Sequence, residues 1–238
     1  MPLSFDSRRV GDVTVLTCSG RMLAGDETAA FQSHLEDVIR WNPRLVLHLA
    51  GVDSIDSGGL GLIVRYMTRA RNAGGAMTLC AVSPKIDQVL TMTRLRSVLP
   101  PHETEAEAIA EAYRGGTGFD PSLVRWNVLC VDPSPDVLAY LRELLKKAGY
   151  QPMTAANMPD ALVLLTATQP AVVVIGAELQ ATRGTRAADQ FHRAASARAV
   201  VELPAGFGGR DAGAAAQDVV DAIRACFAEG APRTDAAL

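Results

Sequence analysis

The sequence of 238 residues lacks the groupings of cysteine and histidine that metal centres and disulfide frameworks need. Its four histidines form no HxH or HxxxH pair, and its four cysteines form no CxxC pair. Three of the cysteines lie inside apolar runs, which is typical of small buried side chains. We therefore predict no metal and no cofactor. The cysteines are Cys18, Cys80, Cys130 and Cys226.

Basic charge and aromatic residues are also scarce. The formal net charge is -3, and aromatic residues make up only 5% of the chain and are scattered along it. A nucleic-acid-binding surface needs clustered lysine and arginine, and a single-strand site needs aromatic rings for stacking. Direct binding to nucleic acid is therefore not expected.

Long hydrophobic runs are absent as well. No apolar run reaches the roughly 18 residues of a membrane span, and the first residues, MPLSFDSRRVGD, lack the apolar core of a signal peptide. We expect no membrane span and a cytoplasmic location. The 48% of hydrophobic residues is nevertheless enough for ordinary domain cores.

The clearest break in the chain is RGGTGFDPS, residues 114–122, where three glycines and a proline follow a helical pattern. Two domains of ordinary size fit on its two sides. We predict a first domain over residues 1–114, a linker over 115–123, a second domain over 124–229 and a disordered tail over 230–238.

The first domain has an α/β pattern. A hairpin is predicted around Gly11-Asp12, a helix over 26–41, and a central strand in RLVLHLAGV. SVLPPHET is predicted as a short edge strand, because prolines cannot donate to a ladder. The second helix follows IDSGGLG, residues 55–61. Residues predicted to face the core from the two helices are Ala30, Phe31, Leu35, Val38 and Ile39, then Leu60, Ile63, Val64 and Met67.

Ser57, at the centre of IDSGGLG, could serve as a helix N-cap, a nucleophile, a phosphate binder or a phosphate acceptor. The segment matches neither the P-loop nor the dinucleotide-binding glycine pattern. It is not a G-x-S-x-G elbow either, and no histidine is assigned to activate the hydroxyl, although His48 lies in the preceding strand. The cap and the acceptor remain the stronger readings.

A phosphate on Ser57 would lie at the predicted N-terminus of a helix, where the N–H groups of Gly58, Gly59 and Leu60 are expected to be free. It would add a charge of about −1.5 to −2. The helix end tolerates that charge, whereas Asp56 and Asp53 are repelled by it. The expected result is a binding switch without global rearrangement, with the two glycines leaving the serine open to a kinase.

The first domain resembles the STAS domain of bacterial anti-sigma factor antagonists. The matching segments are the SG that ends the second strand, VLHLAGVDSIDSGGLGLI, AGGAMTLCAVSPKIDQVL and ETEAEAIA, in family order. The resemblance implies a mixed sheet with helices and a non-enzymatic regulator of transcription. It also implies a partner anti-sigma factor serine kinase, which phosphorylates the serine matching Ser57 and thereby switches the antagonist off.

The resemblance further implies a partner-binding switch region around Ser57. Its residues would be Asp56, Gly58, Gly59, Asp53 and Asp26. Many antagonists carry an acidic residue shortly after the second strand, where this chain has Met22 and Leu23, so the identity of the partner stays open. Two other readings remain: a STAS subunit of another assembly, with a lipid-transport ABC ATPase or a stress-signalling complex, and a hydrolase using Asp56 and Ser57.

The second domain resembles a response-regulator receiver domain, which implies a parallel, flavodoxin-like α/β fold. Of the residues that receiver chemistry needs, only Asp132 matches. Pro133 replaces the second acid, Gly176 the acceptor aspartate and Pro204 the Ser/Thr. Lys147 is the last lysine in the chain, so no later lysine is available to contact a phosphate on the acceptor position, as receiver chemistry requires.

We therefore predict a degenerate receiver-like domain without aspartyl phosphorylation and without metal. It is also shorter than a receiver domain by about one strand-helix unit. Its role would be docking, homodimer formation or positioning of the first domain. An unrelated small α/β domain is the alternative.

Overall fold

The fold is described from a computed structural model, which describes residues 1–115, 127–182, 184–204, 206–207 and 212–229. The chain separates into two compact units, Met1–Asp120 and Pro121–Leu238. Most of the predicted linker, and the whole predicted tail, lie outside the described residues. Each unit is therefore considered by itself.

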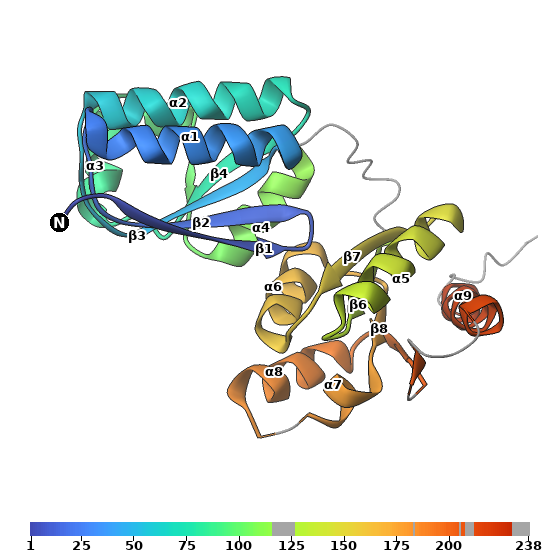
Figure 1. The fold of residues 1–238 in the computed structure, drawn as a ribbon. Coiled ribbons are helices and arrows are strands. Elements are labelled where there is room, and N and C mark those ends of the chain that lie inside the picture. The colour runs from blue at the N-terminus through green and yellow to red at the C-terminus, as the bar shows by residue number, and fades with distance from the viewer. Residues whose placement is uncertain (116–126, 183, 205, 208–211, 230–238) are drawn as a thin grey trace, which may run out of the picture. The chain divides into compact units, whose positions relative to one another are not determined.

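The N-terminal unit alternates strands and helices after an opening hairpin (Figure 1). A short 3-10 helix, η1, follows α3. The elements are β1 (Ser4–Val10), β2 (Val13–Met22), α1 (Asp26–Trp41), β3 (Arg44–Ile55), α2 (Ser57–Asn72), β4 (Ala76–Cys80), α3 (Pro84–Met92), η1 (Leu95–Ser97), β5 (Pro101–His102) and α4 (Glu105–Gly115).

The five strands form one mixed sheet in the order β1-β2-β3-β4-β5. Only β1 runs antiparallel to its neighbour, because the turn at Gly11, with φ of 63°, returns the chain directly to β2. The remaining pairs are parallel. This is the mixed sheet that the resemblance to the STAS domain implied for the first domain.

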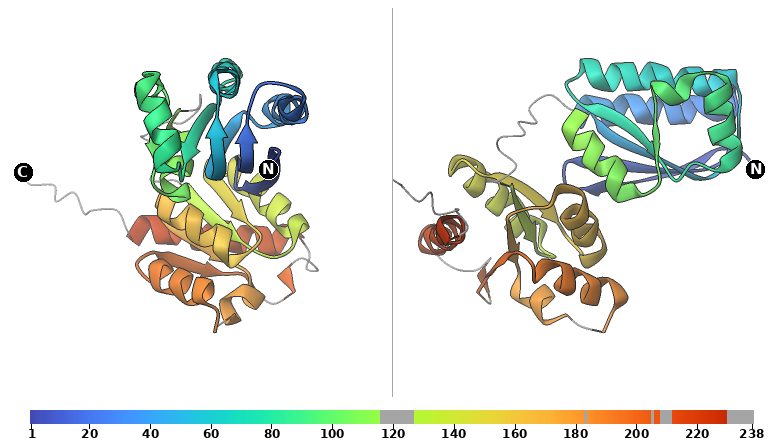
Figure 2. Two further views of the ribbon diagram at one scale, coloured as in Figure 1. Left: turned by 90° about the vertical axis from the view of Figure 1, so that its left-hand side faces the viewer. Right: turned by 180° about the vertical axis from the view of Figure 1, so that it is seen from behind.

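Both faces of the sheet are covered, as the nearly continuous apolar run of β3 predicted. Leu45, Leu47 and Leu49 face α1 and α2, which lie side by side over one face (Figure 2). On the other face α4 packs across β3 and β4, and Thr78 donates a hydrogen bond to the carbonyl of Ala108 at 3.0 Å. The start of α2 is thus held at the end of a fully covered central strand.

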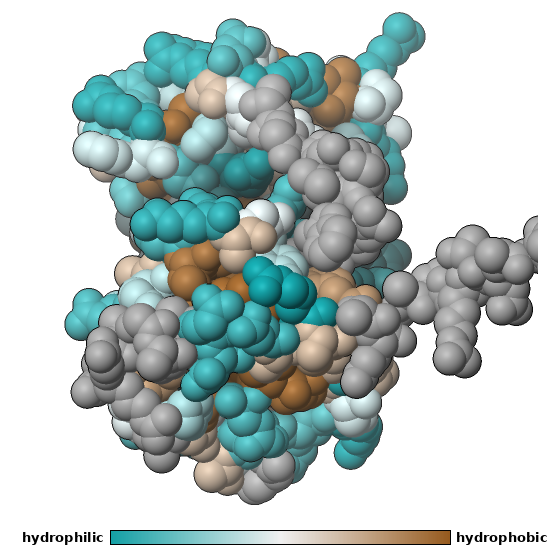
Figure 3. Space-filling model, turned by 90° about the vertical axis from the view of Figure 1, so that its right-hand side faces the viewer, coloured by the Kyte–Doolittle hydropathy of each residue, from teal (hydrophilic) through white to brown (hydrophobic). Residues whose placement is uncertain are grey.

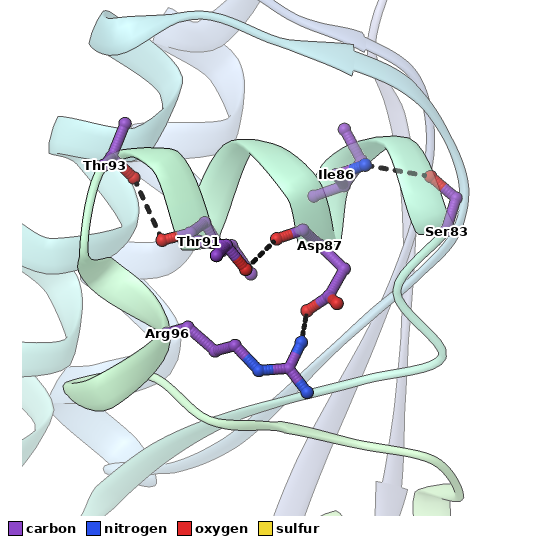
Figure 4. A network of polar contacts seen from close by, with 7 residues as sticks. Ser83, Ile86, Asp87, Thr91, Thr93 and Arg96 are labelled. Atoms are coloured by element: carbon purple, nitrogen blue, oxygen red, sulfur yellow. Dashed lines mark hydrogen bonds and ion pairs between the residues drawn. The ribbon is translucent and has the colours of Figure 1, made fainter.

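Polar contacts fix the helices relative to one another. The Tyr66 hydroxyl of α2 and the Arg69 guanidinium both donate to Glu36 of α1, at 2.9 and 2.7 Å. In α3, the Ser83 hydroxyl accepts a hydrogen bond from the Ile86 N–H, and an ion pair joins Asp87 to a following arginine, Arg96 (Figure 4). The contacts to Glu36 join α1 to α2, whereas the Asp87–Arg96 ion pair joins α3 to η1.

Several element predictions for this unit need correction. The predicted strand SVLPPHET is mostly not extended: η1 ends at Ser97 and only Pro101–His102 pair with β4. Ala30 of α1 is exposed rather than buried, and Val64 of α2 is half-buried. The other predicted core residues of both helices lie in or against the core.

The C-terminal unit continues the alternation. Its elements are β6 (Asn127–Val131), α5 (Pro135–Lys147), β7 (Gln151–Ala155), α6 (Met158–Thr168), β8 (Val172–Ile175), α7 (Ala177–Ala181), α8 (Arg186–Ala195), β9 (Ala199–Glu202) and α9 (Ala212–Glu229). Strand β8 ends at Ile175, because Gly176 is the N-cap of the short helix α7 that follows it.

The described strands of this unit form an all-parallel sheet in the order β7-β6-β8-β9. Numbered within the unit, this is 2-1-3-4, the first four places of the flavodoxin-like order 2-1-3-4-5. Helices α5 and α9 share one core with the sheet, and α6 packs against α8. Relative to a receiver domain, the strand and helix that the sequence predicted to be absent would therefore have stood between β9 and α9.

Candidate functional site

The site at the start of α2 is organised by the carboxylate of Asp56. This residue is the N-cap of α2, and its side chain accepts a hydrogen bond from the Gly59 N–H at 2.8 Å. The same carboxylate accepts from the Ala24 N–H, at 3.0 Å to Oδ2. The Asp56 N–H in turn donates to the Met22 carbonyl at 3.3 Å. Asp56 thus joins the end of β2 to the start of α2.

Ser57 is consequently the first residue of α2 and not its cap, which corrects the simplest reading of the sequence. The expectation of free N–H groups was also wrong for two of the three donors. Gly59 donates to the Asp56 carboxylate, and Leu60 donates to the Asp56 carbonyl at 2.9 Å. The Ser57 side chain is exposed, and among the described residues its hydroxyl has no hydrogen-bond partner.

The two glycines after Ser57 are needed because the loop after β2 lies directly against the helix. A Cβ on Gly58 would lie 2.4 Å from the Ala24 Cβ, and one on Gly59 would lie 2.3 Å from the Met22 carbonyl oxygen. Gly61, one turn further on, faces open space. Close packing against this loop is therefore one reason for glycine at both positions.

Hydrogen bonds hold the pKa of Asp56 below its usual range. The largest effect comes from the Gly59 N–H, followed by the Ala24 N–H, and partial burial opposes both. Asp56 is therefore a carboxylate at neutral pH. It places one fixed negative charge immediately before the exposed hydroxyl of Ser57.

The remaining predicted switch residues lie on two segments next to this point. Asp53 is exposed near the end of β3, and Asp26 is the first residue of α1. Sequence reasoning missed Ala24, which is exposed and covers Gly58. No residue type marks such a contact, because it depends on the path of the loop after β2.

The nucleophile reading gains no support from the structure. His48 lies in the middle of β3, seven residues before its end, and thus roughly 20 Å from Ser57 along the strand. Its Nδ1 is buried without a hydrogen-bond partner among the described residues. A serine without a base within hydrogen-bond distance is not activated.

In the C-terminal unit, the two receiver-site positions Asp132 and Gly176 meet at the ends of β6 and β8. The Asp132 carboxylate accepts a hydrogen bond from the Ser134 N–H at 2.8 Å, and its Oδ2 would lie 2.2 Å from a Cβ on Gly176. Burial raises the pKa of Asp132, opposed by the Ser134 hydrogen bond and aided by the charge of Glu178. The Asp132 side chain thus fills the space that the side chain of an acceptor aspartate at position 176 would need.

We expect Gly176→Ala to destabilise the C-terminal unit by about 1 kcal/mol, because the new methyl group collides with the Asp132 carboxylate. The backbone of Gly176 has φ of −65°, so only space is at issue. Hydrogen exchange of the β8 amides would measure the loss. In an Asp132→Ala background the same substitution should cost much less, and an equal cost in both backgrounds would contradict the explanation.

The described residues contain no group of three or more potential metal ligands. Cys18, Cys80 and Cys130 are buried, which raises the pKa of each thiol to about 12, and Cys226 is partly exposed. The prediction of buried apolar cysteines is confirmed for the first three. Among the helices of the described chain, none is both long and apolar enough to cross a membrane.

In a comparison with known protein families, residues 4–108 match the STAS domain. The chain is 33% identical over 67 residues to the anti-sigma F factor antagonist of Paenibacillus polymyxa, covering 28% of this chain and 57% of that protein. It is 34% identical over 71 residues to a Thermotoga maritima protein described as a candidate anti-sigma factor antagonist, covering 30% and 63%. The chain thus spans less than two thirds of the length of these curated relatives.

A crystal structure of a Thermotoga maritima protein described in the same way gives a similar match. It is 29% identical, with a TM-score of 0.42, and the match covers 45% of this chain and 93% of that one. All three of these matches are shorter than the whole chain.

Proposed function

Because residues 4–108 form a STAS domain, we propose that the protein is an anti-sigma factor antagonist switched at Ser57. In its unmodified form it binds an anti-sigma factor that is also a serine kinase, and phosphorylation of Ser57 ends that binding. The anti-sigma F factor antagonist among its relatives supports the general role. The protein acts by binding and not as an enzyme.

One observation carries the proposal. Ser57 is exposed, and its hydroxyl has no hydrogen-bond partner in the described part of the chain, whereas its neighbour Asp56 caps the helix. The hydroxyl is therefore available for modification without loss of the helix cap. Around it lie the exposed Ala24 and Gly58, whose lack of large side chains leaves room for a partner.

The position of Asp56 determines how the switch would act. A phosphate on Ser57 brings a charge of about −1.5 to −2 next to a carboxylate that already holds the Gly59 N–H. Two adjacent negative groups repel each other, so the phosphate is directed outward. The main consequence is a change of surface charge at the partner-binding region, with the cap of α2 kept.

We expect the cognate anti-sigma factor kinase and ATP to add one phosphate to the full chain, at Ser57. Mass spectrometry with fragmentation of the peptide between Arg44 and Arg65 locates it. Ser57→Ala should abolish the modification. Ser54→Ala is the matched control, because Ser54 lies in the same peptide but is half-buried in β3.

Binding to the same kinase tests the second half of the proposal. Ser57→Ala should bind within a few-fold of the wild type, whereas Ser57→Glu or the phosphorylated chain should bind at least tenfold more weakly, through like-charge repulsion. Equal binding by all forms, or phosphate only at other serines, would refute the switch. Recovery of an ABC ATPase instead of a kinase would favour the alternative of a structural STAS subunit.

A further inference from the structure

The last strand of the C-terminal sheet has one side without a neighbour among the described strands. β9 stands at the end of the order β7-β6-β8-β9 and is paired only with β8. The next described element, α9, packs in the core shared with α5. The fifth place of a flavodoxin-like sheet is thus not filled by a described strand, and an edge strand can pair with another chain.

The hydrogen bonds of β9 show which of its residues face that side. The Leu203 N–H donates to the Ile175 carbonyl of β8 at 2.8 Å. Backbone groups alternate in direction along a strand, so Val201 also faces β8, whereas Val200 and Glu202 direct their N–H and C=O groups away from it. Val200 is 39% exposed, which is unusual for a valine in a strand of this sheet.

The charges on β9 and the residue before it are self-complementary. Arg198 and Glu202 lie two residues before and two residues after Val200. One carboxylate oxygen of Glu202, Oε1, accepts a hydrogen bond from the Gln180 side chain at 2.8 Å, so the other oxygen is the one that would meet Arg198. If two copies of β9 run antiparallel with Val200 opposite Val200 of the second copy, then Arg198 lies opposite Glu202 of the second copy, twice. Opposite charges directly across an antiparallel pair are stabilising, and like charges are destabilising.

We propose that two copies of the chain associate through antiparallel pairing of β9, centred on Val200. The pairing joins the two four-stranded sheets into one continuous sheet, with the two valines on the twofold axis and an Arg198–Glu202 ion pair on each side. The Arg198 N–H already donates to the Ala195 carbonyl at 2.9 Å, so backbone pairing ends at this residue. This inference does not rest on the role proposed for Ser57.

The other outer strands fit self-pairing less well. β7 contains Pro152, which has no N–H to donate, and β5 is two residues long and begins with Pro101. In β1, Arg8 is already ion-paired with Glu105. On the face drawn in Figure 3, hydrophobic residues are interspersed with hydrophilic ones.

Charged side chains on an edge strand can also serve to prevent pairing, and charge reversal separates the two roles. Sedimentation velocity of the full chain over a range of concentrations should show a dimer. Arg198→Glu and Glu202→Arg should each weaken it at least tenfold, because each places like charges opposite one another. The double variant, which exchanges the two charges, should restore the dimer.

Crosslinking tests the register independently. With Cys226→Ser as background, Val200→Cys should form a disulfide between two copies on mild oxidation, since directly opposed residues have Cα atoms about 5.5 Å apart. Ala197→Cys is exposed but lies off the axis, and should not crosslink. A chain that stays monomeric, a dimer unaffected by either single reversal, or equal crosslinking at both positions would overturn the proposal.

Discussion

Replacing Gly59 with alanine is expected to destabilise the N-terminal unit by about 2 to 3 kcal/mol. The added methyl carbon would lie 2.3 Å from the Met22 carbonyl oxygen and 2.9 Å from Ile55 Cγ1. The first of these is a backbone atom of β2, whose neighbouring residues are locked in the sheet, so it cannot turn aside as a side chain would. Relief requires α2 to move away from the strand.

The same helix supplies the control. Gly61 faces open space, and alanine is a better helix former than glycine, so Gly61→Ala should stabilise the unit by up to about 1 kcal/mol. Hydrogen exchange of the α2 amides in the full chain measures both changes, as protection lost in one variant and kept or gained in the other. Unchanged protection in Gly59→Ala would mean that the loop after β2 yields easily.

Asp56→Ala is expected to destabilise the unit by about 2 kcal/mol at neutral pH, since it removes a helix cap and leaves the Ala24 N–H without its acceptor. The pKa of Asp56 is lowered in the folded state, so its contribution is present above the ordinary value of 3.8. That contribution is lost as the pH falls through the lower, folded pKa. The difference between wild type and variant should therefore shrink in acid.

Two substitutions test that explanation. Asp56→Asn retains a capping oxygen without the charge, so it should lose less stability and should remove the acid dependence. Asp53→Ala changes an exposed carboxylate three residues earlier and should alter stability by no more than about 0.5 kcal/mol. Chemical denaturation at neutral and acidic pH provides the comparison. An equal loss for Asp53→Ala and Asp56→Ala would show that general charge, and not the cap, is responsible.

Periodicity and turn residues predicted the elements that carry most of the fold. The apolar run of β3 requires cover on both faces, and the spacing of Phe31, Leu35 and Ile39 requires one buried helix face. The mixed sheet of the first unit was implied by the resemblance to the STAS domain, whereas the parallel sheet of the second also follows from its alternating strands and helices. The loss of one strand-helix unit could also be anticipated, because too few residues remained after β8.

The local roles at the start of α2 could not be predicted in the same way. Both Asp56 and Ser57 are good N-cap residues, and sequence alone does not say at which of them the helix begins. In the structure Asp56 is the N-cap, and the Ala24 N–H of the loop after β2 donates a hydrogen bond that holds its carboxylate in place. The reason for Gly58 and Gly59 was likewise hidden, since it lies in residues more than thirty positions earlier in the chain.

Helix α4 also decides where the N-terminal unit could be cut from the rest of the chain. Glu105 is ion-paired with Arg8, and the Tyr113 hydroxyl accepts a hydrogen bond from the Asp12 N–H at 3.1 Å, so α4 holds the opening hairpin at two points. A fragment ending at residue 108, where the family match ends, would lose Ile109, Ala112 and Tyr113 and uncover one face of the sheet. An excised domain intended for binding studies should therefore extend at least to Gly115.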